Sequence, residues 1–417
     1  MVERQVYPPD YGAVTTAAAG IRQLQEKHMI GMPVEKYVMR QNTDGSNSRV
    51  VSGVITTYRS NVANTSQVVA DQVFQLETSA PVSSYTTSNV SGTVFNMDGR
   101  YRPRLRYDHY DGSGNVVQFT KSDGVPACYL WGYQNSLPIA QTVNADIGTT
   151  EQFADQNYVT LFPITANQSE FAPVSLPLDL NHAQTVTVTI DIQRMGAGPP
   201  PFSPYLEIRL LNQQGVRVFG DEIFYTGSVT RTLTLPAGVY TFYYRGSVYP
   251  DPANGYLGSR LRLEAPYRTK ATRQRVLHTS FEEDGTADAT AKTGRRSFQG
   301  AYTLKMPAQA GRYILSWWQK PAGGGNWTLT EQVQDLAANA PDRSLGDNNT
   351  RIDEVRLYPA EAQMTTYTYD PLVGMTSQTG PDNVTLHYEY DGSGRLKLVR
   401  DHKGNIVKNY RYRYRPQ

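Results

Sequence analysis

The chain lacks several features on which common protein classes depend. Its 417 residues include one cysteine, Cys128, which excludes a disulfide framework and a thiolate metal cage. No apolar run reaches the roughly 18 residues of a membrane-spanning helix, so none is predicted. Lys and Arg number 40 against 38 Asp and Glu, and the formal charge of +2 argues against a general nucleic-acid binder.

Charged residues are also scarce, at 19%, and hydrophobic residues make up 39%, both low for a helical protein. Tyrosine is abundant, with 29 residues, as are glycine with 34 and proline with 25. Tyrosine suits pleated surfaces, whereas glycine and proline form turns. The composition predicts an all-β protein. One short N-terminal helix is expected over residues 13–29, where Ile21 and Leu24 belong to a helical spacing of apolar residues.

Alternation of apolar and polar residues divides the rest of the chain into strand-rich segments. The stretch from Leu137 to about Thr165 is less regular and is expected to be a connection, and the basic stretch from Arg268 to Arg275 a linker. The predicted segments are residues 1–33 (helix and lead-in), 34–168 (hairpin-like sheet and connection), 169–268 (β-sandwich), 276–360 (jelly roll) and 361–417 (tyrosine-rich repeats).

The C-terminal segment repeats. YTYD at residues 367–370 recurs as YEYD at residues 388–391, a spacing of 21 residues. YDGSG at residues 390–394 is also found at residues 110–114. Self-similarity at a fixed period is typical of repeat architectures, whose units bury their faces only by stacking.

Tyr390-Asp391-x-x-Gly394-Arg395, followed by Asp401-x-x-Gly404-Asn405, resembles the YD repeat of RHS proteins. The resemblance covers about residues 365–414 and, less fully, residues 34–133. The sequence of residues 353–371 further resembles the very long RHS proteins of Bacteroidetes-type bacteria. Family members are large exported or surface proteins whose repeats coil into a β-sheet strip, often a shell around a C-terminal toxin. No toxin domain or proteolytic core motif is visible in this chain, which favours a fragment or short relative.

Residues 276–360 resemble carbohydrate-binding modules of the β-jelly-roll type, from Phe281-Glu282 at the first strand to residues 352–355 at the last. In such modules a structural calcium often joins these strands, and Glu282 and Asp353 match its positions. The alternative is that both are solvated carboxylates. Sugar rings stack on exposed aromatic side chains, and the candidates for this role are Trp317, Trp318, Trp327, Tyr302 and Tyr313. Adjacent strand residues point to opposite faces, so at most one of Trp317 and Trp318 lies in the core.

Catalysis has little support in the sequence. No nucleophile elbow, His-Glu-x-x-His or phosphate loop occurs, and the six histidines show no metal-ligand spacing. Cys128 stands in an apolar strand and is predicted to be buried rather than nucleophilic. Asp111, Ser113 and Asn115 have the spacing of ligands in a calcium loop. Val116 stands where such a loop requires Gly and Ser122 where it requires an acid, so a turn is predicted there instead. The tail from Arg395 to Gln417 is basic and alternates Tyr and Arg over residues 410–415, which indicates an amphipathic strand more than a nucleic-acid site.

The sequence thus predicts a non-enzymatic scaffold or interaction protein of the RHS/YD-repeat type. The alternatives are an adhesin-like glycan-binding module and the shell fragment of a toxin-delivery protein. The expected partners are a polysaccharide or another surface protein. Because residues 1–5, MVERQ, have no signal-peptide pattern, an extracellular or cell-surface location implies that the chain is part of a longer protein.

Overall fold

The structure is a computed structural model that describes residues 1–164, 168–174, 176–194, 205–223, 227–247 and 259–413. Strands take up 57% of the chain and helix 4%, which confirms the all-β class. The chain separates into two compact units, one of Met1–Thr149 with Gln274–Gln417 and the other of Thr150–Arg273. No described helix is long and apolar enough to cross a membrane.

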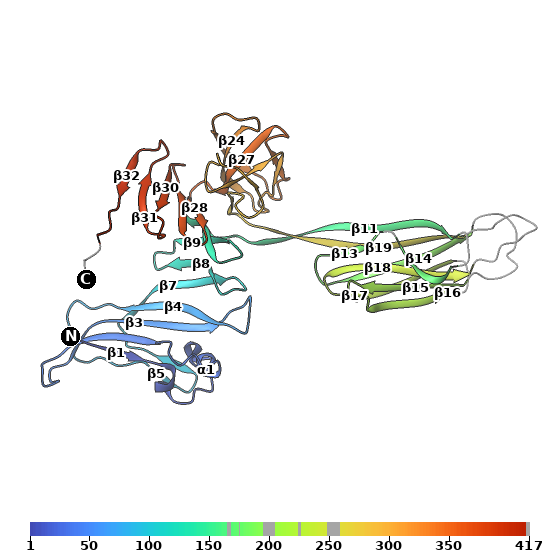
Figure 1. Ribbon diagram of the computed structural model, residues 1–417. Helices are drawn as coiled ribbons and strands as arrows, with labels where there is room; N and C mark the ends of the chain where they lie inside the picture. Colours follow the sequence, from blue (N-terminus) through green and yellow to red (C-terminus); the bar gives the residue numbers. More distant parts are fainter. Residues whose placement is uncertain (165–167, 175, 195–204, 224–226, 248–258, 414–417) are drawn as a thin grey trace, which may run out of the picture. The chain divides into compact units, whose positions relative to one another are not determined.

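The first unit is built on one antiparallel sheet of 13 strands, the main sheet (Figure 1). Its two sequence-distant halves meet where β10 (Leu137–Val143) pairs with β28 (Gln363–Asp370), from Ala140 opposite Thr366 to Val143 opposite Gln363. The other strands, in sheet order, are β1 (Val2–Val6), β2 (Glu35–Arg40), β3 (Arg49–Ser60), β4 (Val68–Leu76), β7 (Tyr101–Tyr110), β8 (Val116–Lys121) and β9 (Pro126–Gly132) before β10, and β29 (Gly374–Thr379), β30 (Thr385–Tyr390), β31 (Leu396–Arg400) and β32 (Ile406–Asn409) after β28. A small hairpin, β5 (Asn89–Ser91) and β6 (Val94–Asn96), lies outside it.

The turns of the repeats share one hydrogen-bond pattern. After β30 the N–H of Asp391 donates to the carbonyl of Arg395 at 2.8 Å, and the N–H of Gly394 donates to the carbonyl of Asp391 at 2.9 Å. The Asp391 carboxylate also accepts two backbone N–H groups of the turn. Asp111 and Asp401 organise their turns in the same way. The aspartate therefore satisfies the turn that its own backbone begins, and the turn predicted at Asp111 is confirmed.

The tyrosine that precedes the aspartate has its own repeated contact. Its hydroxyl donates to a backbone carbonyl on the preceding strand of the main sheet. These bonds run from Tyr110 to Ala70 at 2.8 Å, from Tyr369 to Pro138 at 2.9 Å and from Tyr390 to Met375 at 2.8 Å. Each hydroxyl links two neighbouring strands beside their ladder hydrogen bonds.

A sandwich follows within the first unit and packs on the main sheet; residues 277–359 are called the docked sandwich. Leu315 and Leu357 of its larger sheet are fully buried against Leu304 and Leu345 of the smaller sheet. Ile314 and Tyr358 pack instead with main-sheet residues such as Met364 and Cys128. The larger sheet comprises β20 (Leu277–Thr279), β21 (Thr286–Ala287), β22 (Arg296–Gln299), β27 (Thr350–Pro359), β24 (Gly311–Pro321) and β25 (Thr328–Leu336), and the smaller β23 (Tyr302–Leu304) and β26 (Arg343–Leu345).

The second unit is the inserted sandwich, residues 150–273. Alternating side chains, such as Val188 and Ile190 from one sheet and Ile208 and Leu210 from the other, make its core. One sheet holds β11 (Thr150–Ile164), β19 (Ser259–Arg273), β14 (Gln184–Arg194) and β17 (Gly227–Leu235), and the other β12 (Gln168–Pro173), β18 (Gly238–Ser247), β15 (Tyr205–Asn212), β16 (Arg217–Ile223) and β13 (Leu178–Leu180). The unit begins and ends as one ladder, because Thr150 pairs with Arg273.

Two connections expected from the sequence are strands instead. Residues 150–164 form β11 and residues 259–273 form β19, so the expected linker from Arg268 is largely paired backbone. β14 pairs with β19 only over residues 259–264, so the part of the ladder formed by residues 150–157 and 266–273 has no third strand. Because this part does not enclose a core, its sequence shows no alternation of apolar and polar residues, and alternation could not predict these strands.

The N-terminal helix is shorter than predicted. It covers Ile21–Glu26 as α1, after two 3₁₀ turns, Pro8–Tyr11 and Ala18–Gly20. Ala19 and Gly20 have left-handed backbones, with φ of 50° and 73°, which ends helical geometry before Ile21. A Cβ on Gly20 would lie 2.1 Å from the carbonyl oxygen of Tyr58, so only glycine permits this close approach.

The C-terminal tail also differs from the predicted strand. Residues 410–413 are irregular, and the remaining residues, 414–417, lie outside the described residues. β32 ends at Asn409, opposite Leu398 of β31, and one more backbone bond follows it, from the N–H of Tyr410 to the carbonyl of Lys397 at 2.9 Å. The Tyr412 ring lies 4.6 Å from the guanidinium of Arg395 instead of continuing an alternating face.

The left-handed glycine of the repeat turn gives a testable prediction. Gly394 has a φ of +73° and a Cβ there would contact nothing, so Gly394→Ala tests backbone conformation alone. We expect it to lower the local opening free energy of the β30–β31 ladder by about 1–2 kcal/mol, measured by amide hydrogen exchange. Gly392→Ala, in the same turn and equally uncrowded but without a left-handed φ, is the control and should change little. Equal effects would contradict this explanation.

Candidate functional site

Glu282 and Asp353, the predicted calcium ligands, hold the two sides of one loop in the docked sandwich. Oδ2 of Asp353 accepts the N–H groups of Lys292 and Thr293 at 2.9 and 3.0 Å. Oε1 of Glu282 accepts the N–H groups of Arg295 and Arg296 at 2.9 and 2.8 Å. The carboxylates thus clamp a tight loop by its backbone donors.

The charges around this clamp are buried together. Burial raises the pKa of Asp353 well above its ordinary value, and the neighbouring carboxylates Glu354 and Glu282 raise it further. Burial also raises the pKa of Glu282, against the effect of the amides it accepts. Burial opposes ionisation of Glu354 too, but His278 and Arg356 outweigh it and lower that pKa to about 2. A cation at Asp353 and Glu282 would relieve their mutual repulsion.

Three of the four carboxylate oxygens at Asp353 and Glu282 already accept backbone N–H groups, because Oδ1 of Asp353 takes the N–H of Glu354 at 2.7 Å. Within the described part of the chain, no group of three or more His, Cys, Asp and Glu side chains is placed to hold a metal ion. Calcium at this pair stays a prediction, and these oxygens are the ligands it would use.

Arg356 is the largest fully buried side chain in the described structure and was not predicted as important. It is paired with Glu354 at 2.9 Å, with side chains 0% and 2% exposed. It also donates to the carbonyl of Gly380 at 2.8 Å and to the Thr366 hydroxyl at 2.6 Å, both in the main-sheet segment. One guanidinium therefore joins β27 of the docked sandwich to strands β28–β30.

His278 shares this buried region. Its Nδ1 lies 3.0 Å from the carbonyl of Val355, while its Nε2 is buried without a described partner. Burial lowers the pKa of the imidazole, against the attraction of Glu354. Nothing in the sequence pattern separates these residues from a solvated face, because their burial depends on how the following strands fold back, as the contacts of Arg356 with Thr366 and Gly380 show.

Three of the five predicted sugar-stacking residues belong to the core. Tyr313 is 0% exposed and Trp317 is 6% exposed. Tyr302 is half-buried, and its ring lies edge-on to Phe281 at 5.0 Å between centroids. The rings of Tyr313 and Trp317 have no free face for a sugar, so this part of the prediction is corrected.

Trp318 and Trp327 have different surroundings. Trp318 lies on the opposite face of β24 from Trp317, the face on which Ile314 packs toward the main sheet, and Lys292 Nζ lies 3.8 Å from its ring centroid. Trp327 is half-buried, donates from Nε1 to the carbonyl of Thr290 at 2.6 Å, and lies 4.4 Å from Nζ of Lys320. A lysine ammonium thus lies against each ring, and sugar stacking at Trp318 and Trp327 stays a prediction.

Lys320 belongs to a satisfied polar cluster that the sequence did not reveal. Its side chain is 4% exposed and pairs with Asp288 at 3.0 Å. It also donates to the carbonyl of Thr290 at 3.0 Å. Burial opposes ionisation of Asp288, but bonds from Thr290, Lys320 and Ser297 lower its pKa below the ordinary range. The cluster fixes the loop that carries Thr290.

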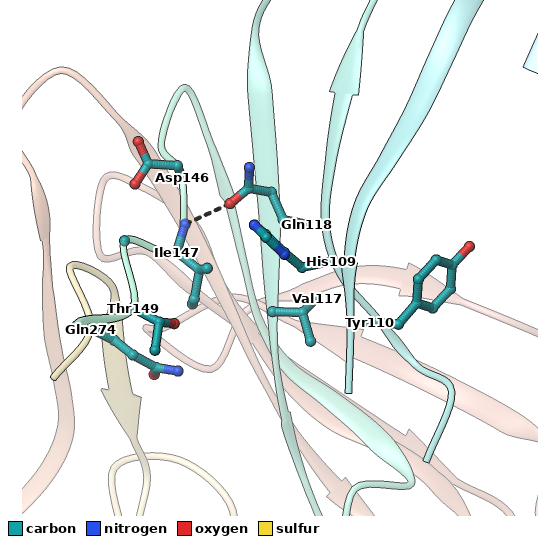
Figure 2. A pocket seen from close by; sticks show the side chains of 9 residues that line it. His109, Tyr110, Val117, Gln118, Asp146, Ile147, Thr149 and Gln274 are labelled. Atoms are coloured by element: carbon teal, nitrogen blue, oxygen red, sulfur yellow. Dashed lines mark hydrogen bonds between the residues drawn. The ribbon is translucent and has the colours of Figure 1, made fainter. Parts of the chain in front are cut away.

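Figure 2 shows a pocket of about 510 Å³ in the first unit, between main-sheet strands β7–β8 and residues 146–149 and 274. The amide oxygen of Gln118 accepts the N–H of Ile147 at 3.0 Å, and Asp146 pairs with Arg275 at 3.0 Å. The Tyr110 ring points away from Asp146 in this view. The Asp146 carboxylate also points away from the exposed His109 in this view.

Cys128 lies in β9 and is buried, as predicted. Burial raises the pKa of its thiol to about 12, so the thiolate that a nucleophile needs is scarce at neutral pH.

No protein-family model and no curated protein matches the chain.

The buried ion pair gives the second prediction. Arg356→Met leaves Glu354 buried without its cation, and we expect a loss of about 3–5 kcal/mol in the unfolding free energy of the first unit. The control is Arg295→Met, which removes an ion pair to Asp370 from an arginine whose side chain is 73% exposed and should cost about 1 kcal/mol or less. Calorimetry measures both. Similar losses in the two variants would remove the special role of Arg356.

The calcium prediction has its own measurement. If calcium joins Glu282 and Asp353, added calcium should raise the melting temperature of the first unit above its value in chelator, since a ligand of the folded state stabilises it. Glu282→Gln should abolish that rise. A melting temperature independent of calcium would leave the backbone clamp as the role of both carboxylates.

Proposed function

We propose that the chain is a non-enzymatic scaffold of the RHS/YD-repeat type, at an extracellular or cell-surface location, whose main sheet carries two sandwiches for interaction with a polysaccharide or another surface protein. The observation that supports this is the repeated tyrosine–aspartate unit. Its aspartate organises the turn and its tyrosine hydroxyl bonds the preceding strand at Tyr110 and Tyr390, 280 positions apart. A unit with the same structural role in both sequence-distant halves of the sheet suits a scaffold.

The way in which the inserted sandwich is attached also supports a carrier role. Both of its ends leave the first unit together, since Thr150 pairs with Arg273 and the N–H of Arg275 donates to the carbonyl of Ile147 at 3.0 Å. The main sheet meanwhile closes through β10 and β28 without any strand of the insertion. Such an attachment lets a module be carried without interrupting the sheet.

The test removes the module and asks what remains. With residues 150–273 replaced by a short glycine linker, we expect the rest of the chain to keep its β-sheet circular dichroism and a cooperative thermal transition. In the producing bacterium, antibodies to the first unit should label intact cells for both the full and the shortened chain.

The control deletion, residues 145–273, also removes Ala145 and Ile147 from a buried cluster and should unfold. A remainder that unfolds when only residues 150–273 are removed would contradict the carrier role. Labelling that requires permeabilised cells would contradict the surface location.

A further inference from the structure

The inserted sandwich holds a pocket that none of the predicted site residues lines. Its volume is about 400 Å³, within the roughly 300–1,000 Å³ of small-molecule sites. It lies where β11 and β19 meet the loop before β14, and its lining includes Phe153, Asp155, His182, Gln184 and Arg268. All of these residues belong to the second unit.

Two rings form a corner of this pocket. The Phe153 ring meets the His182 ring at 5.4 Å between centroids and 63°, an edge-to-face arrangement. Phe153 is nevertheless 43% exposed, on a strand whose next core residue, Tyr158, is buried. An exposed phenylalanine in a concave site, held by a second ring, offers an apolar surface for a ligand.

A charge pair stands beside the rings. Arg268 lies 3.1 Å from Asp155, and its guanidinium carbon lies 5.0 Å from the centroid of Phe153. The two side chains are 57% and 90% exposed, so both keep hydrogen-bonding capacity toward the pocket. Their charges cancel, which disfavours phosphate and other anions as ligands.

The pocket wall is fixed before any ligand arrives. The Gln184 amide donates to the carbonyl of Arg268 at 2.8 Å and accepts its N–H at 2.7 Å. The Asn181 amide makes the same pair of bonds with Lys270, at 2.8 and 3.0 Å, and its oxygen lies 3.0 Å from Nδ1 of His182. A wall held by two such pairs loses little freedom on binding.

We propose that this pocket binds a neutral carbohydrate. A sugar ring has an apolar face of C–H groups, which fits the corner of Phe153 and His182. Its adjacent hydroxyls both donate and accept, which fits the Asp155 carboxylate and the Arg268 guanidinium side by side. The inference deepens the proposed function and rests on it in one respect, because it assigns the proposed polysaccharide contact to the inserted sandwich and names the ligand class.

The experiment exposes the full chain to a printed array of neutral and acidic glycans, followed by titration of the best neutral glycan. Phe153→Ala removes the ring and Asp155→Ala removes an exposed acceptor that the fold does not need. We expect each to weaken binding about tenfold or more. Leu161→Ala, which removes a 53% exposed side chain from the same strand outside the pocket, and Trp327→Ala in the docked sandwich should leave the affinity unchanged.

Several results would overturn the proposal. One is a folded full chain, verified by its thermal transition, that binds no neutral glycan. Others are affinity unchanged in both pocket variants, or a loss with Trp327→Ala that places binding in the docked sandwich. A preference for acidic glycans would refute the neutral class. Because surface labelling is measured separately, failure here leaves the scaffold proposal intact.

Discussion

The hydrogen bond from a repeat tyrosine to the strand before it is the contact on which the main sheet depends. In a wide antiparallel sheet, register is weakly specified in strands whose two faces are both polar. Tyr110, Tyr369 and Tyr390 each add a bond that forms in one register only, since the hydroxyl must reach one carbonyl. The aspartate after Tyr110 and Tyr390 sets the turn at the same point, so strand and turn are fixed by two adjacent residues.

Because strand register and turns are fixed locally, the main sheet tolerates a long insertion between two of its paired strands. Between β10 and β28 the chain builds both sandwiches and then returns to pair Thr142 with Met364. The docked sandwich secures the return, because Arg356 bonds Thr366 and Gly380 while Tyr358 packs with Met364. A buried ion pair adds little to stability by itself, but it specifies one docking arrangement when every donor is satisfied.

Local patterns predicted much of this fold. Alternation of apolar and polar residues predicted strands within residues 169–268, where β14 lies, and the tyrosine–aspartate repeat predicted stacked β units within residues 361–417, where the β30–β31 hairpin lies. What failed depended on distant neighbours. In the part of the β11–β19 ladder beyond β14, residues 150–157 and 266–273, no described side chain is fully buried, so the sequence there shows no alternation. Arg356 and Glu354 follow the spacing of an exposed charged face and are buried only because the main sheet covers them.

The candidate sites were predicted less well for the same reason. Trp317 and Trp318 were correctly expected on opposite faces, but the sequence could not show which neighbours cover each. The pocket at Phe153 and His182 joins residues from a stretch taken as a connection and a turn 29 positions later. The pairing of β11 with β19, together with the amide bonds of Asn181 and Gln184 to β19, brings them together.

The junction of β10 and β28 also decides how the molecule bears a mechanical load. When tension is applied to the two ends of the chain, it crosses directly from Val143 to its partner Gln363 through the ladder. Until that ladder separates, the covalent path through both sandwiches is slack. The sandwiches would thus be shielded from stretching, and the main sheet would act as the tensile element to which they are attached.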